Sequence, residues 1–149
     1  MNNIGIVVMD VCAPEYSYDY YLEKETNDKF VDYLNSRLQD LKNQGAKIIE
    51  INYLPKTHPA LTVDFDISTI SMKDLNRFIN KHNIKHIIYT GFHYPICTNS
   101  SRSLGSYFVK NNQKLEQVSI AIQLTRSTKE NFIVPLHETE KYGVRQVML

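Results

Sequence analysis

The stretch that indicates the fold reads Ile4-Gly-Ile-Val-Val-Met-Asp10. Its first six residues are almost continuously apolar and rich in β-branched side chains, which favours a strand buried on both faces. Strands of this kind are typical of parallel sheets that are covered by helices on both sides. Similar apolar runs follow along the chain, at residues 47–53, 84–90 and 117–124.

The segments between these runs have helical patterns. Apolar residues recur every three or four positions over 24–44, and Gly45 is well placed to end that helix. A shorter helix is predicted to begin after Ser71, whose hydroxyl can cap the first turn, with Asp74 near the positive end of the helix dipole. A third helical pattern covers 97–110. The alternation predicts βαβ units and hence an α/β fold with a mostly parallel sheet between two layers of helices.

Two parts of the chain give weaker signals. Residues 54–71 are predicted to be irregular, because prolines exclude regular helix from the first part of this segment. Beyond residue 125 the sequence suggests only short strands, at 132–134 and 144–148. Since no linker or repeat divides the 149 residues, we expect one domain, residues 1–149.

Composition narrows the functional classes. Seventeen Lys and Arg against sixteen Asp and Glu give a net charge of +1, so no strong field attracts nucleic acid or a membrane surface. No apolar run approaches the roughly 20 residues that cross a bilayer. The first residues lack the features of a signal peptide, and two cysteines are too few for a disulfide scaffold. We therefore expect a cytoplasmic protein with reduced thiols and no nucleic-acid or membrane partner.

Two polar residues stand where a parallel sheet binds ligands, beyond the carboxyl ends of its strands. Asp10 directly follows the first strand, where its carboxylate can act as a general base or can cap backbone amides in a turn. Cys97 follows Gly91 and opens the third helical pattern. Unpaired N–H groups at a helix start favour a thiolate and can stabilise an oxyanion, although a lone cysteine can also be a small buried apolar residue.

These segments carry a family resemblance. An apolar strand that ends in Asp10, followed later by Gly91, five residues, Cys97 and the hydroxyls of Ser100 and Ser101, resembles the isochorismatase-like cysteine hydrolase family. The resemblance covers roughly residues 3–124. It implies a three-layer αβα fold with Rossmann-type topology, about six strands and a homo-oligomeric assembly. It also implies hydrolysis of an amide, imide or related bond of a small molecule without a cofactor.

The resemblance further implies a catalytic set of cysteine, aspartate and lysine. Cys97 would attack the substrate carbon, Asp10 would take and return the proton, and a lysine would hold the thiolate. Counting along the chain places Asp64 or Phe65 where the family has its lysine. Lys56, eight residues earlier, is the candidate, because Lys73 lies on the predicted short helix and is expected to be solvated. The second interpretation is therefore a catalytically silent member that serves as a binding or assembly module. A flavodoxin-like or Rossmann-like binder is a third interpretation, which the lack of a glycine-rich loop after the first strand disfavours.

The predicted substrate-binding residues surround these positions. Phe92, His93 and Tyr94 precede Cys97, and Tyr16 belongs to a tyrosine-rich loop after the first strand. Aromatic rings there can wall a pocket for a flat substrate, or the loop can pack on its own helix or on another subunit. His93 can pair with the cysteine or can simply line the pocket.

Two further combinations are weaker. His58, Asp64 and Asp66 could imitate the metal site of nicotinamidase-like relatives, but they lack closely spaced histidines, so we expect no metal and no cofactor. Cys12 and Cys97 could form a redox pair, but they lack the spacing of a C-x-x-C motif.

Overall fold

The sheet predicted from the apolar runs is present. The computed structural model describes residues 1–16, 24–92, 104–106, 109–110, 115–126 and 144–149. In these parts the strands are β1 (Ile4–Met9), β2 (Lys47–Ile51), β3 (Ile67–Ser68), β4 (His86–Phe92), β5 (Gln117–Arg126) and β6 (Arg145–Val147). They form one six-stranded sheet in the order β3-β2-β1-β4-β5-β6, and every neighbouring pair is parallel. This confirms the α/β prediction.

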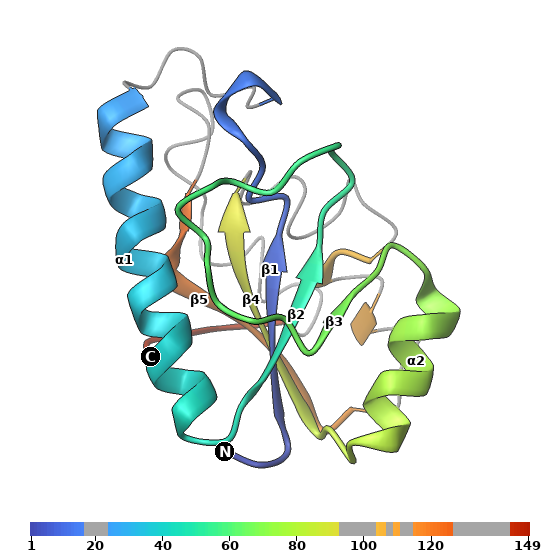
Figure 1. Cartoon of the computed structure of the whole chain (residues 1–149). Coiled ribbons are helices and arrows are strands. Elements are labelled where there is room, and N and C mark those ends of the chain that lie inside the picture. Colours follow the sequence, from blue (N-terminus) through green and yellow to red (C-terminus); the bar gives the residue numbers. More distant parts are fainter. Residues whose placement is uncertain (17–23, 93–103, 107–108, 111–114, 127–143) are drawn as a thin grey trace.

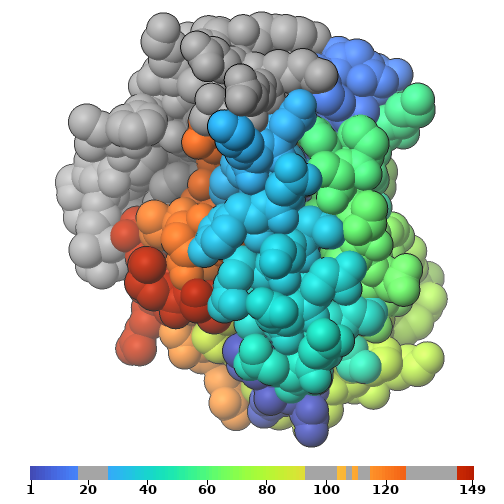
Figure 2. Space-filling view, turned by 60° about the vertical axis from the view of Figure 1, so that its left-hand side comes forward, coloured from blue at the N-terminus to red at the C-terminus, as the bar shows by residue number. Residues whose placement is uncertain are grey.

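Helices cover the two faces of this sheet (Figure 1). α1 (Lys24–Asn43) lies on one face and α2 (Met72–Lys81) on the other. Alternate residues of β1 and β2 point to opposite sides, so that Val8 and Ile48 pack with α1, whereas Met9 and Ile49 pack with α2. Figure 2 shows α1 exposed along its outer side, between the segment after β2 and the end of the chain.

Local signals at the helix ends are also confirmed. The Ser71 hydroxyl accepts a hydrogen bond from the Asp74 N–H at 3.3 Å, as expected for an N-cap. Gly45 follows α1 with φ 101°, a left-handed conformation that glycine adopts easily. No helix in the described ranges is long and apolar enough to cross a membrane.

The prediction that 54–71 is entirely irregular was wrong. β3 forms there, where Ile67 pairs with Ile49 and Ser68 with Glu50. Asp66 holds this pairing, because its N–H donates to the Ile48 carbonyl and its carboxylate accepts from the Ile48 N–H, both at 2.8 Å. Two residues are too few for a detectable alternation, and their partner strand lies far away in the sequence.

The remaining boundaries shift modestly. β2 ends at Ile51 rather than at residue 53, and β4 runs over His86–Phe92 rather than 84–90. The strand expected within 144–148 is β6. The predicted strand at 132–134 and most of the helical pattern at 97–110 lie outside the described residues.

Candidate functional site

Asp10 is fully buried at the carboxyl end of β1. Its backbone has φ 52°, a left-handed conformation that aspartate tolerates better than most residues. The Asp10 N–H donates to the Ile51 carbonyl, and its Oδ1 accepts from the Tyr53 N–H, each at 2.8 Å. The carboxylate is thus oriented by the loop that follows β2.

Gly91 brings β4 close to this carboxylate. It pairs with Met9, the residue before Asp10, and has φ 109°. A Cβ atom at Gly91 would stand 2.7 Å from the backbone nitrogen of Met9, so any larger residue would push the two strands apart. Phe92, the next residue, therefore lies beside Asp10. The carboxyl ends of β1 and β4 are thus neighbours, as the sequence predicted.

The chain that continues from Phe92 leads to the predicted nucleophile. Cys97 lies five residues farther on, and both Cys97 and the predicted substrate-binding residues His93 and Tyr94 fall outside the described residues. Phe92 itself is buried and stacks on Phe30 of α1, with 6.1 Å between the ring centroids.

Sequence reasoning missed a cation at this edge, Arg126. It is the last residue of β5, is partly buried and pairs with Phe92. Its guanidinium carbon lies 5.9 Å from the centre of the Phe30 ring, and its Nε donates to Asn27 Oδ1 at 3.3 Å. The strand was predicted to end at residue 124. The sequence did contain a signal for Arg126, because a basic residue just beyond a predicted strand end holds the same kind of position as Asp10.

Lys56 contacts the loop after β1 through its backbone. The Lys56 carbonyl accepts hydrogen bonds from the Ala13 N–H at 2.9 Å and from Asn52 Nδ2 at 3.3 Å. The residue is exposed to solvent. Within the described part of the chain, no ion pair joins Lys56 to Asp10.

Two other residues from the sequence analysis flank the loop after β1. Tyr16 closes a short 3-10 helix, η1 (Pro14–Tyr16), and its side chain is partly open to solvent. Cys12 is fully buried, and its N–H donates to the Asp10 carbonyl at 2.9 Å. Asp10 and Cys12 therefore belong to the same buried turn.

The residues considered as metal ligands have separate structural partners. His58 Nδ1 accepts from the Ala60 N–H at 3.1 Å, so Nε2 carries the proton and donates to Asp28 at 2.9 Å. Asp66 is bound to β2, and Asp64 is exposed. No group of three or more potential metal ligands occurs among the residues that the structure describes.

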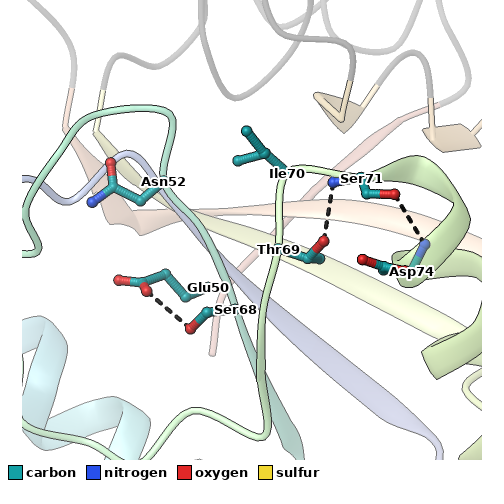
Figure 3. A pocket seen from close by; sticks show the side chains of 7 residues that line it. All are labelled: Glu50, Asn52, Ser68, Thr69, Ile70, Ser71 and Asp74. Atoms are coloured by element: carbon teal, nitrogen blue, oxygen red, sulfur yellow. Dashed lines mark hydrogen bonds between the residues drawn. The ribbon is translucent and has the colours of Figure 1, made fainter.

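A hollow of about 410 Å³ lies at the same edge of the sheet (Figure 3). It is lined by Glu50, Asn52, Ser68, Thr69, Ile70, Ser71 and Asp74, none of which was predicted as a site residue. Several of these groups already pair with one another; for example, the Ser68 hydroxyl donates to Glu50 at 3.0 Å. The hollow is therefore a mostly polar recess at the carboxyl ends of β2 and β3.

A buried tyrosine on β4 connects the sheet to the segment around residue 104. The Tyr89 hydroxyl on β4 donates to the Leu104 carbonyl at 2.6 Å. Burial, with a smaller contribution from Tyr53, raises the pKa of Tyr89 well above its usual value. The phenol therefore stays neutral and ties residue 104, seven positions after Cys97, to the sheet.

Comparisons with solved structures identify the fold. The chain is similar to an isochorismatase family protein from Desulfovibrio vulgaris, with a TM-score of 0.71, 9% identity, and coverage of 99% of this chain and 95% of that one. It is also similar to a pyrazinamidase from Pyrococcus horikoshii solved with zinc (TM-score 0.66, 14% identity, 99% of both chains). An N-carbamoylsarcosine amidase from Thermoplasma acidophilum gives a TM-score of 0.67 at 10% identity, over 98% of this chain and 96% of that one.

The sequence comparisons add nothing to these likenesses, since no family model and no curated protein matches the chain. Identities of 9% to 14% over nearly whole chains show a shared fold and leave the chemistry open. The chain therefore has the isochorismatase-like α/β fold that its sequence resembled.

Proposed function

We propose that this protein is a hydrolase that cleaves an amide, imide or related bond of a small molecule, with Cys97 as nucleophile and Asp10 as its acid and base. The observation that carries the proposal is the buried Asp10 carboxylate beside Gly91 and Phe92, because Cys97 follows Phe92 by only five residues in the sequence. Two proteins of the same fold are amidases by name, which supports this reaction class. We further propose that the protein is cytoplasmic and homo-oligomeric.

The reaction proceeds in two halves. The Cys97 sulfur forms a bond to the substrate carbonyl carbon while its proton passes to the Asp10 carboxylate. The C–N bond then breaks, and Asp10 returns the proton to the leaving nitrogen, which leaves a thioester on Cys97. Water attacks this thioester and gives its proton to Asp10, the carboxylic acid departs, and the sulfur recovers a proton.

Alkylation rates test the nucleophile. Iodoacetamide at neutral pH should modify Cys97 much faster than Cys12, which is fully buried and serves as a control within the same chain. The rates are read by mass spectrometry of peptides containing each cysteine. Equally slow modification of both thiols in the folded protein would overturn the proposal.

Substitution Asp10→Asn separates the base from the fold. Asparagine tolerates the same left-handed backbone and keeps an oxygen that can accept from the Tyr53 N–H. Loss of the base should slow hydrolysis, followed as ammonia release from a panel of small amides, by about 10²- to 10⁴-fold. Alkylation of Cys97 should slow as well, because the sulfur loses the group that takes its proton. Unchanged rates of hydrolysis and alkylation in the folded variant would show that Asp10 is not the base.

A second candidate function follows from Lys56. This lysine is exposed and has no ion pair with Asp10 in the described structure, so its role as the cationic member of the catalytic set stays a prediction. We therefore keep the catalytically silent binding or assembly module as the alternative. Slow alkylation of Cys97 together with no release of ammonia from any amide would favour this alternative.

A further inference from the structure

We infer that Arg126 is an anion-binding residue and that the substrate carries a carboxylate near the bond to be cleaved. The inference deepens the proposed function and rests on it for the reaction, although the anion site itself is argued from Arg126 and its neighbours. None of the residues expected from the sequence to bind substrate carries this charge.

The first step is the state of the guanidinium. Arg126 is partly buried, and the only hydrogen bond or ion pair of its side chain to the described residues joins Nε to Asn27 Oδ1. No described carboxylate neutralises it. An arginine that is withdrawn from water gains from an acidic partner, because removing a charge from water is costly. The terminal Nη groups are therefore left as donors for an anion that is not part of the described protein.

The second step is the way in which the side chain is held. The guanidinium lies over the Phe30 ring at 5.9 Å, and Phe30 in turn stacks on Phe92. Asn27, which fixes Nε, is itself buried. Stacking on an aromatic face and a bond at Nε orient the fork and leave its outer edge available, which is the arrangement that binds a planar carboxylate with two hydrogen bonds.

The third step is position. Met9 pairs with Gly91, and Phe92 pairs with Arg126, so Asp10, Phe92 and Arg126 stand at the same level on three adjacent strand ends. Neighbouring strands are about 4.8 Å apart, which places the backbones of Asp10 and Arg126 about 10 Å from each other. A small molecule can place its carboxylate on Arg126 and its C–N bond near Asp10.

A binding experiment tests this without requiring turnover. Succinamate and glutaramate, which carry one amide and one carboxylate, are compared by calorimetry with the neutral diamides succinamide and glutaramide. The measurements use the full chain with Cys97→Ala, so that no probe is hydrolysed. We expect at least one amido acid to bind about ten- to a hundredfold more tightly than its diamide.

Three arginine variants assign this preference. Arg126→Gln should abolish it, and Arg126→Lys should retain only part of it, because lysine keeps the charge but not the fork. Arg37→Gln is the matched control, since Arg37 lies on α1 and pairs with Asp40. Circular dichroism confirms that each variant is folded, and Arg126→Lys carries the test if Arg126→Gln does not fold.

Either of two results would overturn the inference: a charge preference that survives replacement of Arg126, or no binding of the amido acids at millimolar concentration. A failure of the proposed chemistry looks different. In that case Cys97 alkylates slowly and no ammonia is released, whereas the charge preference is still lost with Arg126.

Discussion

Substitution Gly91→Ala should be the most damaging single methyl addition in the sheet. Alanine at φ 109° adopts a backbone conformation that costs about 1–2 kcal/mol. Its Cβ would also stand 2.7 Å from the Met9 nitrogen, and backbone of a central strand cannot move aside as a side chain can. Overpacking of this kind costs typically about 1–3 kcal/mol. We therefore expect a loss of about 2–5 kcal/mol, a large share of the roughly 5–15 kcal/mol that stabilises a domain.

Two other glycines provide the controls for this prediction. Gly45 has φ 101°, but the close contact of a Cβ there is with the side-chain oxygen of Asn2, which can rotate away, so that mainly the conformational cost remains. Gly5 has no left-handed backbone, and its Cβ would meet the ends of the Ile49 and Ile84 side chains at 3.0 and 3.3 Å. The change at Gly5 should stay within about 1 kcal/mol.

Urea unfolding followed by circular dichroism measures all three variants. We expect the urea midpoint to fall most for Gly91→Ala, less for Gly45→Ala and least for Gly5→Ala. The dependence of the unfolding free energy on urea concentration should be similar in all three variants. If Gly91→Ala were no worse than Gly45→Ala, the close approach of β1 and β4 would not be rigid. Asp10 would then not depend on this approach for its position.

Three smaller effects follow from other contacts. Burial lowers the pKa of His86 below 6.5, so the unfolded chain binds the proton more readily than the folded chain does. The free energy of unfolding should therefore be highest above pH 6.5 and should decrease as the pH falls from 6.5 to the folded-state pKa. Urea midpoints measured across that range should lose this decrease in the variant His86→Gln. Tyr89→Phe should cost about 1–2 kcal/mol of unfolding free energy, because the buried Leu104 carbonyl loses its donor, and an unchanged thermal midpoint would contradict this. Ser71→Ala should cost about 1 kcal/mol through loss of the cap on α2, whereas Ser71→Asp should restore most of it in the same melts.

The sequence was sufficient for those features that depend on local pattern. The continuous apolar runs gave four strands and their parallel arrangement, and Asp10 was recognisable because a carboxylate directly follows one of these runs. The cap at Ser71 was equally local. In each case the neighbours that determine the structure stand within a few positions along the chain.

Features that depend on pairing between distant segments were not predictable. β3 exists because Ile67 and Ser68 meet β2, and the Asp10 carboxylate is held by the N–H of Tyr53, 43 positions away. Arg126 reaches the level of Phe92 only because the register of β5 shifts against β4 after Tyr89. Without this shift a different residue would face Phe92, and no sequence pattern marks such an irregularity.

The charges at this edge bear directly on the choice between a hydrolase and a silent module. The family resemblance implies one lysine that holds the thiolate and polarises the site. Here Lys56 is exposed, and Arg126 is held two strands from Asp10 by Asn27 and Phe30. Stabilisation of a Cys97 thiolate would then rest on the N–H groups at the start of the helix predicted from residue 97, an effect of about 2 kcal/mol at most. A hydrolase of this kind should react more slowly at neutral pH than one with the lysine in place, and its rate should increase as the pH rises. The preference of its Arg126 site for amido acids over diamides should stay the same over that pH range.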